Sequence, residues 1–471
     1  MNSLRTIQRL AAGLPTVGRF MRAPLPFLQA TRASHGDVAK LTMLRHPWLI
    51  LSHPEDIERV LIGHAGDLVR DEFSHVLKRA LGQGLLTSEG ELWKRQRRLA
   101  ATAFTPKRIR GYATAMARVT ANGLDRLAGV AAGQRTINLH EEMSHLTMEV
   151  VADVLFGASV GPAEADTVRD TMHVYNDFFA QSPEAILRLP PWVPTPRNRA
   201  MNAATRAIDA LVAQIIEARR SGAQESDDLL SALLGAIDED GTRMDDAQLR
   251  DEILTLFLAG HETTALALTH AIYLLAKHPE IEARALREIR HVLGDRALSE
   301  DDVPKLVYVD RIVKESMRLF PPAWITGREA ARPFELALHS GERLAIEEKT
   351  QIVMSQWIVH RDPRWFPNPE VFDPDRFDPE YAKQRPRYAY FPFGGGPRVC
   401  IGNHFATMEA NLMLAMTLQR YHFELVPFEE LRFAPSVTLR PKGEGVHVTV
   451  SERLPTRRTD APTRLPIDSL A

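Results

Sequence analysis

Apolar residues recur at helical spacing along most of the 471-residue chain. The longest such pattern runs from about Met244 to Lys277 and predicts a helix of roughly 50 Å at 1.5 Å per residue. Its interior contains the sequence AGHETT at 259–264. Glycine disfavours a helix interior by about 1 kcal/mol, and threonine can direct its hydroxyl to the carbonyl one turn earlier. We therefore expect a local bulge or kink, which is often found at functional sites.

Other segments carry either helical or strand patterns of apolar residues. Helices are expected from Pro54, between residues 85 and 106, through most of 107–235, over 279–293 and from about Asn403. Residues 71–90 read as a loop with a short helix. Strand patterns bounded by turn formers lie at 36–51, as a strand pair, and at 431–450, as a hairpin.

Composition narrows the function classes. The formal net charge is −2, and this provides no global positive field for a nucleic-acid partner. The single cysteine excludes an intrachain disulfide, which fits a reducing cytoplasm. No apolar run is long enough to span a bilayer, so residues 1–35 are predicted to be a soluble N-terminal segment. Leu4, Ile7, Leu10 and Leu14 either dock on the domain or rest on a membrane surface. Residues 455–471 read as a disordered tail.

The only cysteine, Cys400, lies in the stretch FPFGGGPRVCIG at 391–402. The three glycines at 394–396 let the backbone adopt positive φ and pass close to a flat or bulky group. Cys400 precedes a predicted helix, whose N-terminal dipole favours a thiolate over a thiol, and Arg398 adds a positive charge. A lone cysteine is commonly a small buried hydrophobic residue, but this spacing of Phe393, Gly396, Arg398, Cys400 and Gly402 indicates a ligand.

This stretch resembles the haem-binding loop of the cytochrome P-450 superfamily. The resemblance implies that Cys400 is the thiolate ligand of the iron in haem b, with Phe393, Arg398 and Gly402 as cofactor-binding residues. Nearly the whole chain follows the same order of motifs. The resemblance implies a mainly α fold with a smaller β-rich region. It also implies a single haem-thiolate monooxygenase domain at 36–454 that encloses one haem.

Three further residues match cofactor-binding positions of this family. Trp93 and Arg97 are four residues apart and share a helix face. Considered alone they would suit a solvated basic helix with a buried tryptophan, but the resemblance implies that both reach a haem propionate. Arg328 matches a second propionate-binding arginine. Charge-assisted bonds of this kind contribute roughly 1.5 to 3 kcal/mol.

The AGHETT segment matches the oxygen-activation motif of the family. Splitting dioxygen requires protons, and a hydroxyl beside a carboxylate can order water for their delivery. The resemblance implies that Glu262 and Thr263 are the catalytic acid and alcohol, and that Ala259 and Gly260 leave room above the iron. His261 is not part of the pattern and is expected to be structural or to face solvent.

Glu315 and Arg318 are three residues apart and suit an ordinary surface ion pair. They also match the family's Glu-x-x-Arg motif, which locks to a later arginine, here Arg376. The resemblance implies a structural role for these three residues in holding the Cys400 loop. His360 is a further candidate near the haem edge.

The resemblance implies a reaction that inserts one atom of O2, the cosubstrate, into a C–H bond or double bond of an apolar small molecule. Fatty acids, terpenoids and steroids all remain open as substrates. The expected substrate-pocket residues are Phe73, Leu77, Phe257, Ala323, Trp324, Ile325, Val437 and Thr438.

No flavin- or nicotinamide-binding pattern follows residue 454, so we expect electrons, ultimately from NAD(P)H, to be delivered by separate proteins. The resemblance implies a ferredoxin and its reductase. The basic residues Lys94, Arg95, Arg98, Lys107, Arg108 and Arg110 either dock this acidic partner or only aid solubility. Two rival functions are a peroxygenase driven by hydrogen peroxide, against which Glu262 and Thr263 count, and a non-enzymatic haem sensor or carrier.

Overall fold

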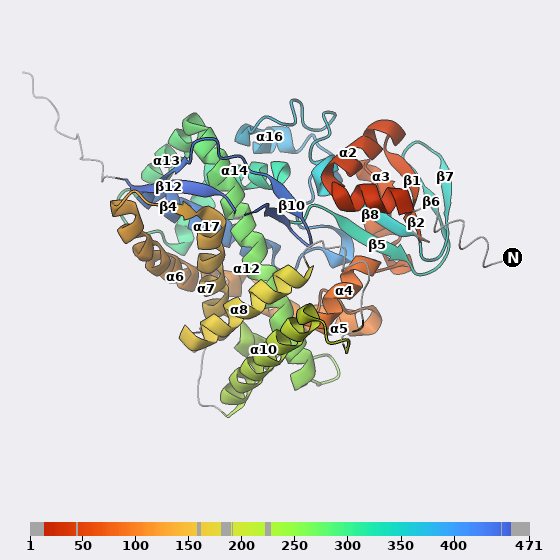
Figure 1. Cartoon of the computed structure of the whole chain (residues 1–471), viewed down its shortest axis with the longest axis horizontal. Helices are drawn as coiled ribbons and strands as arrows, with labels where there is room; N and C mark the ends of the chain where they lie inside the picture. The colour runs from red at the N-terminus through yellow and green to blue at the C-terminus, as the bar shows by residue number, and fades with distance from the viewer. Residues whose placement is uncertain are drawn as a thin grey trace, which may run out of the picture.

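The computed structural model describes residues 14–43, 46–157, 162–179, 190, 192–221, 228–443 and 445–453. Helices form most of this part of the chain, and the strands gather mainly on one side (Figure 1). The mainly α fold with a smaller β-rich region is thereby confirmed.

Helix α12 (Asp246–Lys277) is the long helix predicted from the apolar pattern, and it runs through the middle of the molecule (Figure 1). Asp245 caps it by accepting a hydrogen bond from the backbone N–H of Gln248. Its apolar residues contact α7 (Leu139–Phe156), α14 (Val307–Leu319) and α17 (Asn403–Arg420). Because α12 is packed on several sides, most of its second half is buried.

The remaining helices surround this core. In the described residues they are α2 (Pro24–His35), α3 (Pro54–Glu58), α4 (Glu72–Leu81), α5 (Gly90–Ala101), α6 (Pro106–Ala132), α8 (Pro162–Phe179), α10 (Pro196–Arg220), α11 (Leu229–Gly235), α13 (Pro279–Leu293), α15 (Gln356–Val359) and α16 (Pro379–Ala382). Proline begins several of them because it lacks the N–H that a first turn leaves unpaired.

The main sheet has the strand order β1-β2-β8-β5-β3. Its strands are β1 (Val38–Met43), β2 (His46–Leu51), β3 (Leu68–Val69), β5 (Thr326–Ala330) and β8 (Gln351–Met354). β2 and β8 are parallel and the other pairs are antiparallel. The predicted strand pair at 36–51 is present as β1 and β2, and β6 (Phe334–Ala337) pairs with β7 (Arg343–Ile346) nearby.

The C-terminal strands depart from the predicted hairpin. Only β10 (Phe433–Pro435) and β11 (Leu439–Pro441) form a hairpin. β12 (His447–Glu452) pairs instead with β9 (Tyr421–Leu425) and β4 (Thr136–Asn138). Alternation of apolar residues identifies a strand but does not determine its partner, and this explains the error.

Helix α12 is continuous through the AGHETT segment, so the expected bulge does not interrupt it. The predicted hydrogen bonds to earlier carbonyls are present: Thr263 donates to Ala259 O at 2.7 Å and Thr264 to Gly260 O at 3.1 Å. The threonines thus use the carbonyls without breaking the helix.

None of the helices in the described ranges has the length and apolarity that a membrane-spanning segment needs. Of the four apolar residues singled out near the N-terminus, Leu14 is exposed and the other three lie outside the described residues.

Candidate functional site

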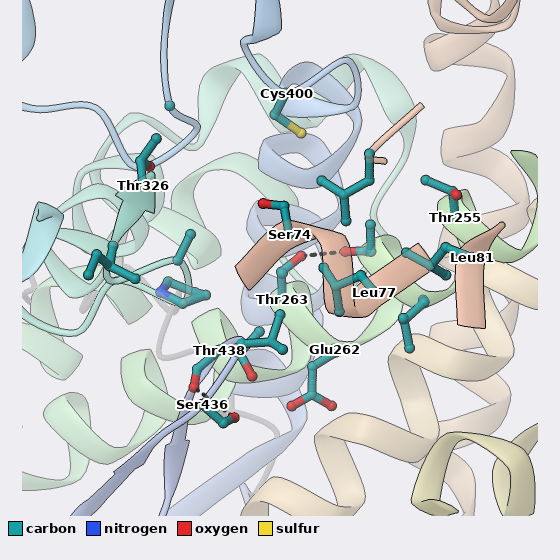
Figure 2. Close-up of a pocket in the computed structure, with 18 of the residues that line it drawn as sticks. Ser74, Leu77, Leu81, Thr255, Glu262, Thr263, Thr326, Cys400, Ser436 and Thr438 are labelled. Carbon is teal, nitrogen blue, oxygen red and sulfur yellow. Dashed lines mark hydrogen bonds between the residues drawn. The ribbon is translucent and has the colours of Figure 1, made fainter. Parts of the chain in front are cut away.

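A cavity of about 1420 Å³ lies between α12, α4, the Cys400 loop, β5 and the turn that joins β10 to β11. Figure 2 shows Cys400 and Thr263 projecting into this space from different elements. Cys400 and Ala259 both have exposed surface because they face the cavity. The volume exceeds that of a typical small-molecule pocket, and it therefore has room for a large flat cofactor together with a substrate.

The Cys400 loop owes its shape to two glycines with positive φ. Gly394 has φ 71° and Gly396 has φ 65°. A Cβ on Gly396 would lie 2.0 Å from the carbonyl oxygen of Leu61, so only glycine fits there. The backbone N–H of Cys400 donates to Phe393 O at 3.0 Å, and α17 begins just after Gly402. This folding directs Cys400 into the cavity.

The Cys400 thiol lies at the wall of this interior cavity, and its position inside the protein raises its pKa through loss of bulk solvation. The N–H of Gly402 and the charge of Arg97 act in the opposite direction. Arg398, which we expected to favour the thiolate, instead donates to Ser88 O at 2.9 Å and pairs with Glu89. Without a cation at the sulfur, the protein alone therefore favours the thiol.

The predicted cofactor-binding cations and Trp93 lie at one end of the cavity. The Arg398 guanidinium stacks over the Trp93 ring at 4.1 Å. Arg328 is buried, and burial, followed by the charge of Arg70, lowers its pKa to about 9. For Arg97 the structure records no hydrogen bond or ion pair to any described residue, although burial lowers its pKa. Arg97 and Arg328 thus form no ion pair with a described carboxylate, whereas Arg398 is paired with Glu89.

Arg70 lines the same end of the cavity, and sequence reasoning missed it. Its Nε atom is buried and has no hydrogen-bond partner among the described residues. Among the described residues, Asp71 and Glu89 are the two carboxylates whose charges act on this group of four guanidinium ions. Arg70 follows a two-residue strand in a segment without a motif, and its burial is visible only in three dimensions. The excess of cations and the unpaired Nε fit a cofactor with two carboxylate groups, as haem b has.

Glu262 is buried, with 4% of its surface exposed, and its carboxylate points away from Cys400 (Figure 2). Its Oε1 lies 2.6 Å from Nη2 of Arg440 on β11. Burial, the largest single effect, raises the pKa of Glu262, but Arg440, His140 and His261 together outweigh it and the net shift is downward. Thr263, the next residue, faces the cavity. Both residues line the cavity, but the carboxylate is directed to Arg440 whereas the hydroxyl donates to Ala259 O.

Ala259 and Gly260 line the cavity as predicted. A Cβ on Gly260 would lie 3.3 Å from a methyl group of Val151 on α7. The missing side chain therefore also allows α7 to pack closely against α12. The hydroxyl oxygen of the neighbouring Thr264, which also lines the cavity, lies 3.0 Å from Glu409 Oε2. His261 is buried, which fits the structural alternative and not the solvent-facing one.

Glu315, Arg318 and Arg376 come together as predicted. Two Arg318 nitrogens donate to the Glu315 carboxylate at 2.7 and 2.8 Å, and Arg376 Nε lies 3.4 Å from Glu315 Oε1. Arg318 also donates to the carbonyl of His360 at 2.9 Å. His360 is fully buried and does not line the cavity, so it is not a residue of the cofactor edge. Its Nε2 accepts from the N–H of Phe391 at 2.9 Å and so links the ion pair to the Cys400 loop.

Most of the expected substrate-pocket residues line the cavity: Leu77, Ala323, Trp324, Ile325, Val437 and Thr438. Phe257 does not. It is buried against Phe156 of α7, with ring centroids 6.3 Å apart, because helical spacing turns it away from the cavity-facing residues 256, 259 and 263. The side chain of Phe73 is outside those that the structure describes.

The fold and this site define a haem-thiolate oxygenase class, and comparison with known proteins supplies the family. The profile of the Cytochrome P-450 family matches residues 14–447. The chain belongs to this family and is an oxidoreductase, a cytochrome P-450 monooxygenase. Membership implies a haem with a cysteine thiolate ligand, the use of O2, a small-molecule substrate and redox partners.

Characterised relatives are similar over most of their length. Cyclooctatin synthase of Streptomyces melanosporofaciens is 36% identical over 91% of this chain and 92% of its own. Pentalenene oxygenase of Streptomyces avermitilis is 36% identical over 89% of this chain and 92% of its own. Cyclooctat-9-en-7-ol 5-monooxygenase of Streptomyces melanosporofaciens is 34% identical over 88% of this chain and 89% of its own.

Proposed function

We propose that this monooxygenase hydroxylates or epoxidises an apolar cyclic terpenoid, with electrons from separate proteins. The observation that carries the proposal is that Cys400 and Thr263 face one large cavity whose remaining walls are mainly apolar. The residue that would bind the cofactor iron and the hydroxyl that would deliver protons therefore both face the cavity in which the substrate would bind.

The substrate class is supported by the relatives and by the cavity. The names pentalenene oxygenase and cyclooctat-9-en-7-ol 5-monooxygenase give a cyclic alkene and a cyclic alkenol as the molecules oxidised by those proteins. The cavity here offers aliphatic walls such as Leu77, Ile325 and Val437, which bind such a molecule by burying its surface. The Thr438 hydroxyl is available for an alcohol group, and the Ser74 hydroxyl, which donates to Asp71 Oδ2, can accept a hydrogen bond from one.

In this proposal Cys400 is the thiolate ligand of the haem iron, and the haem supplies the chemistry of O–O bond cleavage. Arg97, Arg328, Arg398 and Arg70 hold its propionates. Binding of an anionic group there relieves the repulsion between the buried guanidinium groups. The Trp93 ring supports Arg398 by the stacking described above.

Thr263 and Glu262 deliver protons in this proposal. The Thr263 hydroxyl donates to Ala259 O and can accept a hydrogen bond from water in the cavity. Glu262 takes up each proton and passes it towards Thr263, after which its carboxylate is regenerated.

We assign electron delivery to a ferredoxin and a reductase that draws on NAD(P)H, by analogy with the family. The proposed docking residues are partly engaged within the chain. Arg95 and Arg98 lie 3.1 and 2.8 Å from Asp238, and Lys94 lies 2.7 Å from Glu91. These ion pairs favour the solubility alternative for Lys94, Arg95 and Arg98.

The test is a difference spectrum of the reduced, carbon-monoxide-bound protein, followed by a panel of cyclic terpenoids, fatty acids and steroids scored for a spin-state shift. We expect a thiolate spectrum that the Cys400→Ala variant loses, and a spin shift with cyclic terpenoids. A thiolate spectrum that persists in Cys400→Ala would contradict the ligand assignment. A shift with fatty acids alone would contradict the substrate class.

The rival functions are separated by turnover. Product formation with NAD(P)H, ferredoxin and reductase supports the monooxygenase. Peroxide alone giving an equal rate would instead support a peroxygenase, and haem binding without product from either system would support a sensor or carrier.

A further inference from the structure

The counter-charge of Glu262 comes from the hairpin that borders the substrate cavity. Arg440 lies on β11, opposite Ala434 of β10, and its Nη2 is 2.6 Å from Glu262 Oε1. The turn between the two strands places Ser436, Val437 and Thr438 in the cavity wall. The N–H of Leu439 donates to Pro322 O at 2.9 Å, which fixes the hairpin beside Arg440.

The charged and titratable groups near the Glu262 carboxylate determine whether it is ionised. Besides Arg440 on β11, these groups are His140 and Glu141 on α7, His173 on α8 and His261 on α12 itself. His261 Nε2 lies 4.0 Å from Glu262 Oε2. Burial lowers the pKa of both His140 and His261, so both rings are neutral at pH 7. Among the described residues, Arg440 is therefore the one permanent cation that faces Glu262.

We propose that Arg440 is a positioning residue for the proton relay, which keeps Glu262 ionised and directed away from Cys400 so that it can accept each proton. This inference rests on the proposed function of Glu262 and Thr263. The step transfers protons only: the carboxylate gains one proton and releases it towards Thr263, and no electrons move. An uncompensated buried carboxylate would instead retain its proton, because burial disfavours its charged form.

Two kinds of variant test the charge. Arg440→Met and Arg440→Gln remove it, the second with retention of hydrogen-bonding groups, and Arg440→Lys restores it. Arg432→Met is the matched control, because Arg432 precedes the same hairpin, is 77% exposed and pairs only loosely with Glu430 at 3.8 Å. The carbon-monoxide difference spectrum of each haem-loaded variant shows whether the fold and the thiolate ligand are intact.

The direct readout is the infrared band of a protonated carboxyl group, measured on the haem-loaded protein from pH 6 to 8. We expect no Glu262 band in the wild type, in Arg440→Lys or in Arg432→Met. In Arg440→Met and Arg440→Gln we expect a band at pH 7 that disappears when Glu262→Gln is added. The absence of this band from both Arg440→Met and Arg440→Gln would overturn the proposal. The infrared measurement requires no knowledge of the substrate.

The second readout is product formed per NADPH, with a cyclic terpenoid that gives a spin shift as the probe. General acid–base catalysis contributes about 100-fold or more. We expect Arg440→Met to form about tenfold less product per NADPH than the wild type at pH 6, and this difference to decrease as the pH rises. In the Glu262→Gln background the same substitution should have no further effect. An equal loss in both backgrounds would overturn the proposal. A wild type that forms no product would refute the proposed function, whereas a flat pH profile in Arg440→Met with normal wild-type turnover would refute this inference alone.

Discussion

The Thr263 hydroxyl is the cavity-facing polar group of α12 on which the proposed relay depends. Thr263→Ala removes the hydroxyl but keeps the helix, since Ala is the best helix former. We expect NADPH consumption to continue while product per NADPH falls by about tenfold or more. The measurement is the ratio of product to NADPH consumed.

A matched control for this prediction exists one and a half turns further along α12. Thr269 is fully buried, and its hydroxyl donates to Ala265 O at 2.7 Å in the same manner as Thr263. Thr269→Ala should leave the ratio of product to NADPH unchanged. An unchanged ratio in Thr263→Ala as well would count against the relay.

Arg70 is the buried cation that the sequence did not reveal. If it holds a propionate, Arg70→Met removes a charge-assisted bond worth roughly 1.5 to 3 kcal/mol. We expect haem to leave the variant about 10- to 100-fold faster, since 1.4 kcal/mol corresponds to a factor of ten. The rate is measured by transfer of haem to an excess of apomyoglobin, without any turnover.

The exposed Arg332 provides the control for Arg70, because it is paired with Asp67 and lies outside the cavity. Arg332→Met should release haem at the wild-type rate. Equal rates in the Arg70 and Arg332 variants would exclude a propionate role for Arg70.

At the scale of elements, the Glu315–Arg318 pair on α14 joins several segments that have no regular structure of their own. Arg318 is fully buried and donates to the carbonyls of His360, Pro369 and Val371. Glu315→Ala would leave this guanidinium without its counter-charge. The loss of one partner of a buried pair costs about 3–5 kcal/mol.

We therefore expect Glu315→Ala to lower the denaturant midpoint strongly, or to prevent haem incorporation altogether. Glu335→Ala is the comparison, because Glu335 pairs with Arg343 at 2.6 Å on the exposed β6–β7 hairpin. A surface pair of this kind contributes little. Similar midpoints for the two variants would contradict the structural role of Glu315.

The sequence was informative where local pattern and chemistry coincide, as in α12 and in the loop that carries Cys400. It was less informative where the outcome depends on packing between distant segments. The helical spacing that identified α12 could not say that Phe257 faces α7. No motif could reveal that Arg440 on a short hairpin lies opposite Glu262, or that the strand after that hairpin pairs with β9 and β4. Such pairings are decided by tertiary structure.

At the scale of the whole molecule, buried titratable groups determine how stability depends on pH. Burial lowers the pKa of His270 to about 3 and that of His360 well below its ordinary value. In the unfolded chain histidine has a pKa of about 6.5. As the pH falls below this value the unfolded state binds protons that the native state excludes, so stability decreases on the acid side.

Two buried carboxyl groups act in the opposite direction. Burial raises the pKa of Glu252 and of Glu409 to about 8, so the native state retains protons that the unfolded state has released. Their contribution to stability is therefore lost as the pH rises towards 8. Below pH 6.5 this loss opposes the gain from His270 and His360, but burial lowers the pKa of His140 and His261 as well, so the histidines outnumber the two carboxyl groups. We expect a stability maximum near pH 6.5, measured as the urea midpoint from pH 5.5 to 8.5.

The Glu409→Gln variant distinguishes the contribution of the carboxyl groups from that of the histidines in the dependence of stability on pH. It removes one of the carboxyl groups of raised pKa, so the decline above pH 6.5 should become shallower and the rise below pH 6.5 should become steeper. A urea midpoint that rises steadily from pH 5.5 to 8.5 in the wild type would contradict the assignment of neutral buried carboxyl groups.

The approach of the Leu61 carbonyl to Gly396 also has an evolutionary consequence. A side chain at residue 396 collides with the neighbouring backbone whether or not a cofactor is present. A descendant of this chain that lost its prosthetic group would still be selected to keep this glycine for the sake of packing. Part of the sequence motif by which such enzymes are recognised would thus persist in a catalytically inactive relative. The presence of Cys400 would therefore be the better indicator of an active enzyme.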